Sequence, residues 1–133
     1  MSFAWHKFPP HLETIRWSEA DIQSFICVKL DDWLQDVPGL FAYETSLEGI
    51  KLTIGQAKKA KALGMKSGVP DFRFYLPSDR LVSIELKTSK GSVSTNQKER
   101  HALLKKLGFK VHVIKAKSPT DGWNQVYNIL QGI

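Results

Sequence analysis

The centre of the chain constrains the fold most, because two short apolar segments are joined there by four turn-forming residues. The segments read DFRFYL (71–76) and LVSIEL (81–86), and Pro77-Ser78-Asp79-Arg80 separates them. Aromatic and β-branched residues favour strands, and a connection this short holds consecutive strands antiparallel. The sequence therefore predicts a β-hairpin, and the elements on either side of it must cover the hairpin.

Helix and strand signals precede this hairpin. Ser18 can cap a helix whose apolar residues recur at helical spacing until Pro38-Gly39. Residues 40–46 alternate as a strand does. Thr53 and Gln56 then form a capping-box pattern at the start of a lysine-rich helix. We expect helix, strand and helix before the hairpin.

The same kinds of signal follow the hairpin. Ser94 and Gln97 repeat the capping-box pattern and open a helix that Gly108 closes. Residues 109–114 predict a strand, and an amphipathic helix follows Pro119. The resulting order predicts an α/β fold, with a mixed central β-sheet flanked by helices.

The length of 133 residues allows one compact domain, which we expect to span residues 1–133. Residues 1–17 form an aromatic N-terminal arm with Phe3, Trp5 and Phe8, and this arm packs either on its own domain or on a second copy. No apolar stretch approaches the roughly 18 residues of a membrane span, and no signal peptide is recognisable. We expect a cytoplasmic protein without a membrane partner.

Positive charge is concentrated in the second part of the chain. Residues 1–50 carry three basic side chains against eight acidic ones, whereas the remainder carries 16 against five. A basic surface of this kind favours a polyanion such as DNA, although many basic proteins bind no nucleic acid specifically. Candidate DNA contacts are Lys58, Lys59, Lys61, Lys66, Lys90 and Ser94.

Asp71, Glu85 and Lys87 are the candidate catalytic residues. Side chains alternate along a strand, so Glu85 and Lys87 point the same way, beside the start of the strand that follows Asp71. Mg²⁺ prefers oxygen ligands, which the two carboxylates and the Leu86 carbonyl can supply. An ammonium group can then orient the attacking water, while the metal offsets charge on a phosphate.

A simpler interpretation of the same residues is a surface ion pair between Glu85 and Lys87, with Asp71 capping a turn. The Glu-Leu-Lys triplet alone favours this interpretation. The combination of Asp71, the triplet on an apolar strand, and a capped helix start containing Gln97 favours an active site instead.

These residues resemble the VRR-NUC domain within the PD-(D/E)xK nuclease superfamily. The resemblance runs from Glu19 to about Ile114, and its motif residues are Glu19, KALGMKSGVPD (61–71), Glu85, Lys87, Gly91, Ser94 and Gln97. It implies a restriction-endonuclease-like fold and metal-dependent hydrolysis of DNA with Mg²⁺ or Mn²⁺.

The resemblance also implies a role for each site residue. Asp71 and Glu85 hold metal, Glu19 holds it directly or through water, Lys87 positions the water, and Gln97 supports the site. Stand-alone members of this size resemble homodimeric enzymes that resolve DNA junctions, which would place the chain in repair or recombination. A flap-cutting or non-selective nuclease and a catalytically silent DNA-binding module remain the alternatives.

Overall fold

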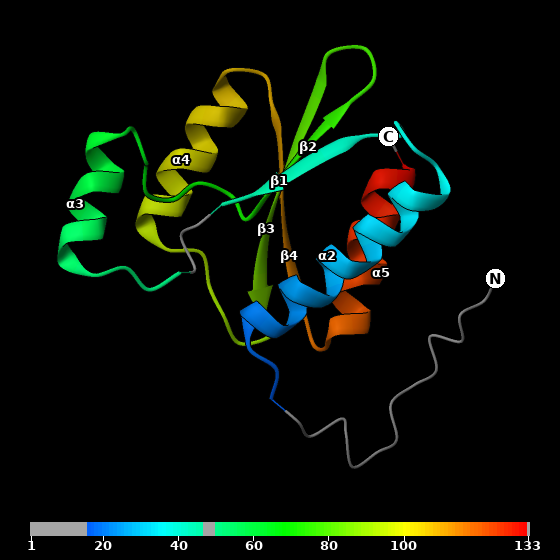
Figure 1. The fold of residues 1–133 in the computed structure, drawn as a ribbon, viewed down its shortest axis with the longest axis horizontal. Coiled ribbons are helices and arrows are strands. Elements are labelled where there is room, and N and C mark those ends of the chain that lie inside the picture. Colours follow the sequence, from blue (N-terminus) through cyan, green and yellow to red (C-terminus); the bar gives the residue numbers. More distant parts are fainter. Residues whose placement is uncertain (1–15, 47–49, 133) are drawn as a thin grey trace.

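The computed structural model describes residues 16–46 and 50–132, so Phe3, Trp5 and Phe8 of the predicted arm lie outside the described residues. The order of elements predicted from the sequence is confirmed (Figure 1). The elements are α2 (Glu19–Asp36), β1 (Ala42–Thr45), α3 (Ile54–Ala62), β2 (Phe72–Leu76), β3 (Arg80–Thr88), α4 (Thr95–Lys106), β4 (Lys110–Ala116) and α5 (Pro119–Gln131).

The strands form one mixed sheet in the order β1-β2-β3-β4. Neighbours β1–β2 and β2–β3 are antiparallel, whereas β3 and β4 are parallel and are connected through α4. The predicted hairpin is therefore β2–β3. Its turn places Ser78 and Asp79 at positive φ, 65° and 60°, as the tightest hairpin turns require.

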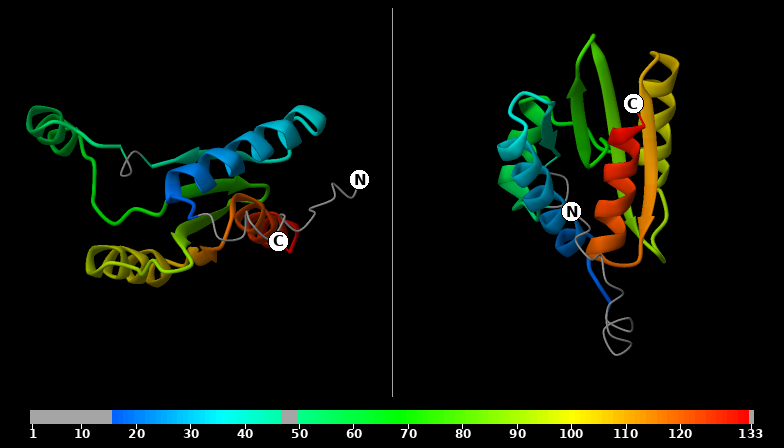
Figure 2. Two further views of the ribbon diagram at one scale, coloured as in Figure 1. Left: turned by 90° about the horizontal axis from the view of Figure 1, so that it is seen from below. Right: turned by 90° about the vertical axis from the view of Figure 1, so that its right-hand side faces the viewer.

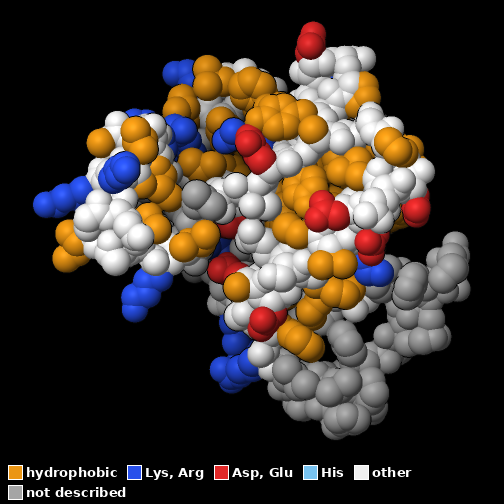
Figure 3. Space-filling model, in the orientation of Figure 1, with side chains coloured by type: hydrophobic (Ala, Val, Ile, Leu, Met, Phe, Trp, Pro, Cys, Tyr) orange, Lys and Arg blue, Asp and Glu red, His pale blue; other side chains and the backbone are white. Residues whose placement is uncertain are grey.

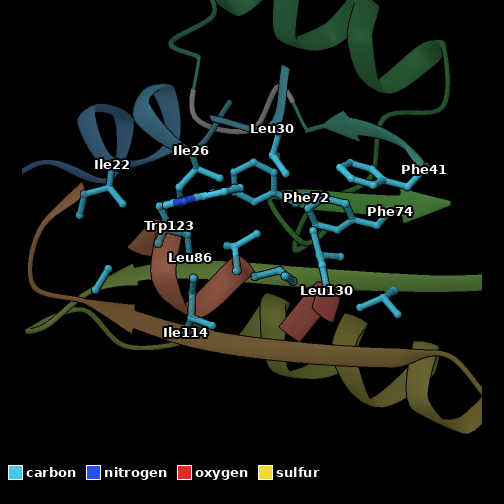
Figure 4. Close-up of a cluster of buried hydrophobic side chains, with 14 residues drawn as sticks. Ile22, Ile26, Leu30, Phe41, Phe72, Phe74, Leu86, Ile114, Trp123 and Leu130 are labelled. Atoms are coloured by element: carbon cyan, nitrogen blue, oxygen red, sulfur yellow. The ribbon is translucent and has the colours of Figure 1, made fainter. Parts of the chain in front are cut away.

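The hydrophobic core lies between the sheet and the pair α2 and α5 (Figure 4). Ile22, Ile26 and Leu30 come from one side of α2, at helical spacing, and are fully buried. Gly122 lets α5 approach α2 closely, because a Cβ added at this glycine would lie 2.7 Å from Cγ2 of Ile22 on α2. This packing fixes the N-terminal end of α2 relative to the sheet.

The alternation of β3 separates the core from the opposite face of the sheet. Val82, Ile84 and Leu86 belong to the core, so the residues between them point to the other face, on which α4 lies (Figure 2). Helix α3 lies at the end of the molecule away from α5, and none of its residues is buried (Figure 1). Within the described ranges, no helix is long and apolar enough to cross a membrane.

Candidate active site

The register of the hairpin brings the predicted acidic residues together. Phe72 pairs with Ile84, so the next residues, Asp71 and Glu85, lie opposite each other. Because Phe72 and Ile84 face the core, Asp71 and Glu85 face the side covered by α4. Lys87 lies two residues beyond Glu85 and shares its face, as the sequence predicts.

A cavity of about 250 Å³ collects these side chains with residues from distant parts of the chain. Glu19 comes from the first turn of α2, and Gln97 comes from the first turn of α4. The lining residues are Glu19, Gly68, Asp71, Glu85, Lys87, Ser94, Asn96 and Gln97. The structure therefore brings together all five residues predicted to be catalytic.

Backbone contacts hold Asp71 in place. Its carboxylate oxygen Oδ2 accepts a hydrogen bond of 2.7 Å from the Leu86 backbone N–H, and its carbonyl accepts one of 3.0 Å from Ser46. The preceding loop lies against α4 at Gly68, where an added Cβ would be 2.4 Å from the Asn96 carbonyl oxygen. Gly68 also has a φ of +77°, so a glycine suits this position for both reasons.

Glu85 is buried, with 1% of its side chain exposed. Gln97 Nε2 donates a hydrogen bond of 3.2 Å to Glu85 Oε2. Gln97 Oε1 accepts one of 2.9 Å from the Ser94 N–H, so the same amide group caps α4 and orients the Glu85 carboxyl. The pKa of Glu85 is raised to about 9, first by burial and then by a hydrogen bond with Asp71 and the Asp71 charge, although the Lys87 charge lowers it.

His101 lies beside Glu85 and is not among the candidate site residues from the sequence. Its Nε2 is 3.6 Å from Glu85 Oε1, and neither atom has a hydrogen-bond partner among the described residues. Burial lowers the pKa of His101, as do the Lys105 and Lys87 charges. Its position four residues after Gln97 indicates the same face of α4, but the spacing alone does not show that this face meets Glu85.

Lys87 lies between two acids. Its Nζ is 3.7 Å from Glu85 Oε2 and 3.9 Å from Glu19 Oε1, and only 11% of its side chain is exposed. Glu19 is about half exposed, and burial raises its pKa although the Lys87 charge lowers it. The simpler alternative of a surface ion pair does not describe Glu85 and Lys87, because both are buried.

The donor set fits a hard divalent cation. Two opposed carboxyls match the one or two carboxylates that Mg²⁺ usually takes, and the buried one has an oxygen without a hydrogen-bond partner among the described residues. Within residues 16–46 and 50–132, no group of three or more His, Cys, Asp or Glu side chains is arranged to hold a metal ion. The Leu86 side chain is in the core, and only its backbone reaches the site.

The candidate DNA-binding lysines lie outside the cavity. Lys58, Lys59 and Lys61 are exposed on α3, and Lys66 and Lys90 are exposed in loops. Figure 3 shows basic side chains gathered over the part of the molecule that holds α3 and α4. Ser94 is the one predicted DNA contact, among these described residues, that lines the cavity.

Comparison with known proteins gives a matching family and several similar structures. The family model described as VRR-NUC domain matches residues 44–118, a range that includes Asp71, Glu85, Lys87 and Gln97 but not Glu19. A solved structure described as a VRR_NUC domain protein is 21% identical, with a TM-score of 0.59 over 87% of each chain. Another, described as a VRR_NUC domain, is 19% identical, with a TM-score of 0.51 over 85% of this chain and 94% of that one. No curated protein matches the chain. The structural likeness confirms the predicted restriction-endonuclease-like α/β fold.

Proposed function

The chain belongs to the VRR-NUC domain family of nucleases, and from this premise we propose that it is a metal-dependent endonuclease acting on branched DNA. One observation carries the proposal: Asp71, Glu85 and Lys87 converge in one cavity, with Glu85 buried among polar partners. Buried acids with strongly raised pKa values are concentrated at functional sites. We take residues 1–133 as a single nuclease domain.

We assign the metal, Mg²⁺ or Mn²⁺, to Asp71 and Glu85, with the Leu86 carbonyl as a further ligand and Glu19 binding directly or through water. When bound, the metal offsets the negative charge that develops on the scissile phosphate. The Leu86 N–H and the Gln97 amide orient the two carboxylates before the metal arrives. This arrangement reduces the rearrangement that binding requires.

Lys87 orients the attacking water and stabilises negative charge at the reacting phosphate. Its ammonium is held within 4 Å of both Glu85 and Glu19. A fixed charge on a largely buried side chain acts more strongly than one in bulk water. The two acids therefore keep Lys87 in place for the reaction.

A panel of labelled substrates tests the substrate class. Four-way junctions, flaps, plain duplexes and single strands are incubated with the protein and Mg²⁺ or Mn²⁺. We expect the junction to be cut fastest, by paired incisions. Faster cutting of flaps favours a flap-cutting nuclease, and equal cutting of all duplexes favours a non-selective one. Binding without cleavage favours a catalytically silent DNA-binding module.

Salt dependence tests the proposed DNA contacts on α3. Neutralising Lys58, Lys59 and Lys61 together should lower the slope of log affinity against log salt by about 0.9 for each phosphate that the protein no longer neutralises. Fluorescence anisotropy with a labelled duplex measures the slope. The control replaces Lys105, Lys106 and Lys110, which are equally charged and exposed but lie at the C-terminal end of α4 and the start of β4. Equal slopes for both triple variants, or no change in either, would place the DNA elsewhere.

We also propose that the working unit is a homodimer. Two matched incisions in a junction need two active sites, which closed twofold symmetry supplies through one interface. Phe3, Trp5 and Phe8 remain our candidate anchors, since interfaces favour large aromatic residues.

Light scattering tests this assembly at micromolar concentration. We expect the intact chain to be dimeric and a chain without residues 1–10 to shift towards monomer. A monomeric intact chain would contradict the dimer, whereas a truncated chain that stays dimeric would contradict only the role of the arm.

A further inference from the structure

We infer that His101 is a positioning residue that donates a hydrogen bond from Nε2 to Glu85 Oε1 and holds this carboxylate for the metal. The inference rests on the proposed function, in which Glu85 is a metal ligand. His101 is not among the residues that line the cavity, so it acts through Glu85 and does not contact metal or substrate itself.

The first argument is that two buried polar atoms lie near each other and lack a hydrogen-bond partner in the described ranges. Glu85 Oε1 and His101 Nε2 are 3.6 Å apart, and their side chains are 1% and 7% exposed. Neither has a hydrogen-bond partner within the described part of the chain. Buried polar atoms are nearly always paired, and a small closure of this gap would pair both at once.

The second argument is that His101 and Gln97 together place one hydrogen-bond donor near each oxygen of the Glu85 carboxylate. Gln97 Nε2 donates to Glu85 Oε2 at 3.2 Å, and His101 Nε2 lies 3.6 Å from Glu85 Oε1. The two donors are four residues apart on α4, so they lie one above the other on the same face of the helix. A carboxylate oxygen has two acceptor positions, so each can accept one hydrogen bond and still bind a cation.

The third argument is that local contacts fix the N-terminus of α4 beside the site. Its first turn is closed by the capping box of Ser94 and Gln97, and its N-terminus lies against the Gly68 loop. The 3.6 Å separation between His101 Nε2 and Glu85 Oε1 needs only a small further approach of the two side chains to reach hydrogen-bond distance.

The test compares two amide substitutions that differ in reach. In His101→Gln the side-chain NH₂ can occupy the place of Nε2, whereas in His101→Asn it is too short to reach Glu85. Calorimetric titration with Mn²⁺ should show affinity about 10–100-fold weaker for the Asn variant, because donors that orient metal ligands commonly contribute that much. The Gln variant should retain most of the wild-type affinity. His112→Asn, which alters a half-buried histidine on β4, should bind Mn²⁺ as the wild type does.

Chemical unfolding without metal separates positioning from a structural role. An Asn variant that folds and binds Mn²⁺ normally, or a Gln variant as weak as the Asn variant, overturns the inference. Failure of both variants to fold assigns His101 a structural role and also overturns it. If the wild type itself does not bind Mn²⁺, the proposed function fails. If Glu85→Gln loses Mn²⁺ while His101→Asn does not, only the inference about His101 fails.

Discussion

Asp71→Asn and Glu85→Gln each lower the rate of Mg²⁺-dependent DNA cleavage by about 10³-fold or more, without unfolding the protein. Each substitution removes one of the two carboxylate charges assigned to the metal. A bound metal stabilises the transition state by several kcal/mol, and about 4 kcal/mol corresponds to the expected loss in rate. This effect should be the largest of any single substitution in the chain.

The structure gives a reason for the fold to survive both changes. The amide oxygen of asparagine can still accept the hydrogen bond from the Leu86 N–H. Burial raises the pKa of Glu85, which favours its neutral form over the usual carboxylate, and glutamine resembles that neutral form.

Initial cleavage rates and thermal unfolding test this prediction together. Mg²⁺ should raise the melting temperature of the wild type, because it binds only the folded state, but should not raise that of either variant. Glu44→Gln is the matched control, since Glu44 is an exposed acid paired with Arg73 at 2.9 Å and does not line the cavity. Rates near wild type in Asp71→Asn or Glu85→Gln would exclude these residues as metal ligands.

Lys87→Ala is expected to lower the cleavage rate by about 10²–10³-fold while metal and DNA binding persist. The ligands Asp71 and Glu85 remain, but the ammonium that orients the water is removed. Removal of one fixed electrostatic group from an active site commonly has an effect of this size.

Single-turnover rates at saturating Mg²⁺, with calorimetry for metal binding, measure the two effects separately. Lys117→Ala, at an exposed lysine after β4, is the control and should keep the wild-type rate. Lost metal binding with normal turnover would contradict the assigned role of Lys87.

The order of elements could be predicted because its signals are local. The three predicted N-caps, Ser18, Thr53 and Ser94, all cap the N-termini of their helices in the structure. The turn at 77–80 joins strands whose register follows from the alternation of core residues. Asp71, Glu85 and Lys87 could be grouped for the same reason, because all three lie on one hairpin.

His101 could not be placed from the sequence, because its position beside Glu85 depends on how α4 packs on the sheet. Its spacing from Gln97 indicates a shared helix face but not which strand residue faces it. The peripheral position of α3 is likewise a tertiary feature, since lysine-rich exposed helices occur both beside and far from active sites. The aromatic arm stays a prediction because Phe3, Trp5 and Phe8 lie outside the described residues.

Cleavage of a labelled four-way junction in Mg²⁺ and in EDTA tests the central claim most directly. One preparation of the protein is divided between the two conditions, and excess Mg²⁺ is later added to the EDTA sample. We predict cleavage in Mg²⁺, none in EDTA, and recovery after Mg²⁺ is restored, because Asp71 and Glu85 act through the metal. Undiminished cleavage in EDTA would contradict the account.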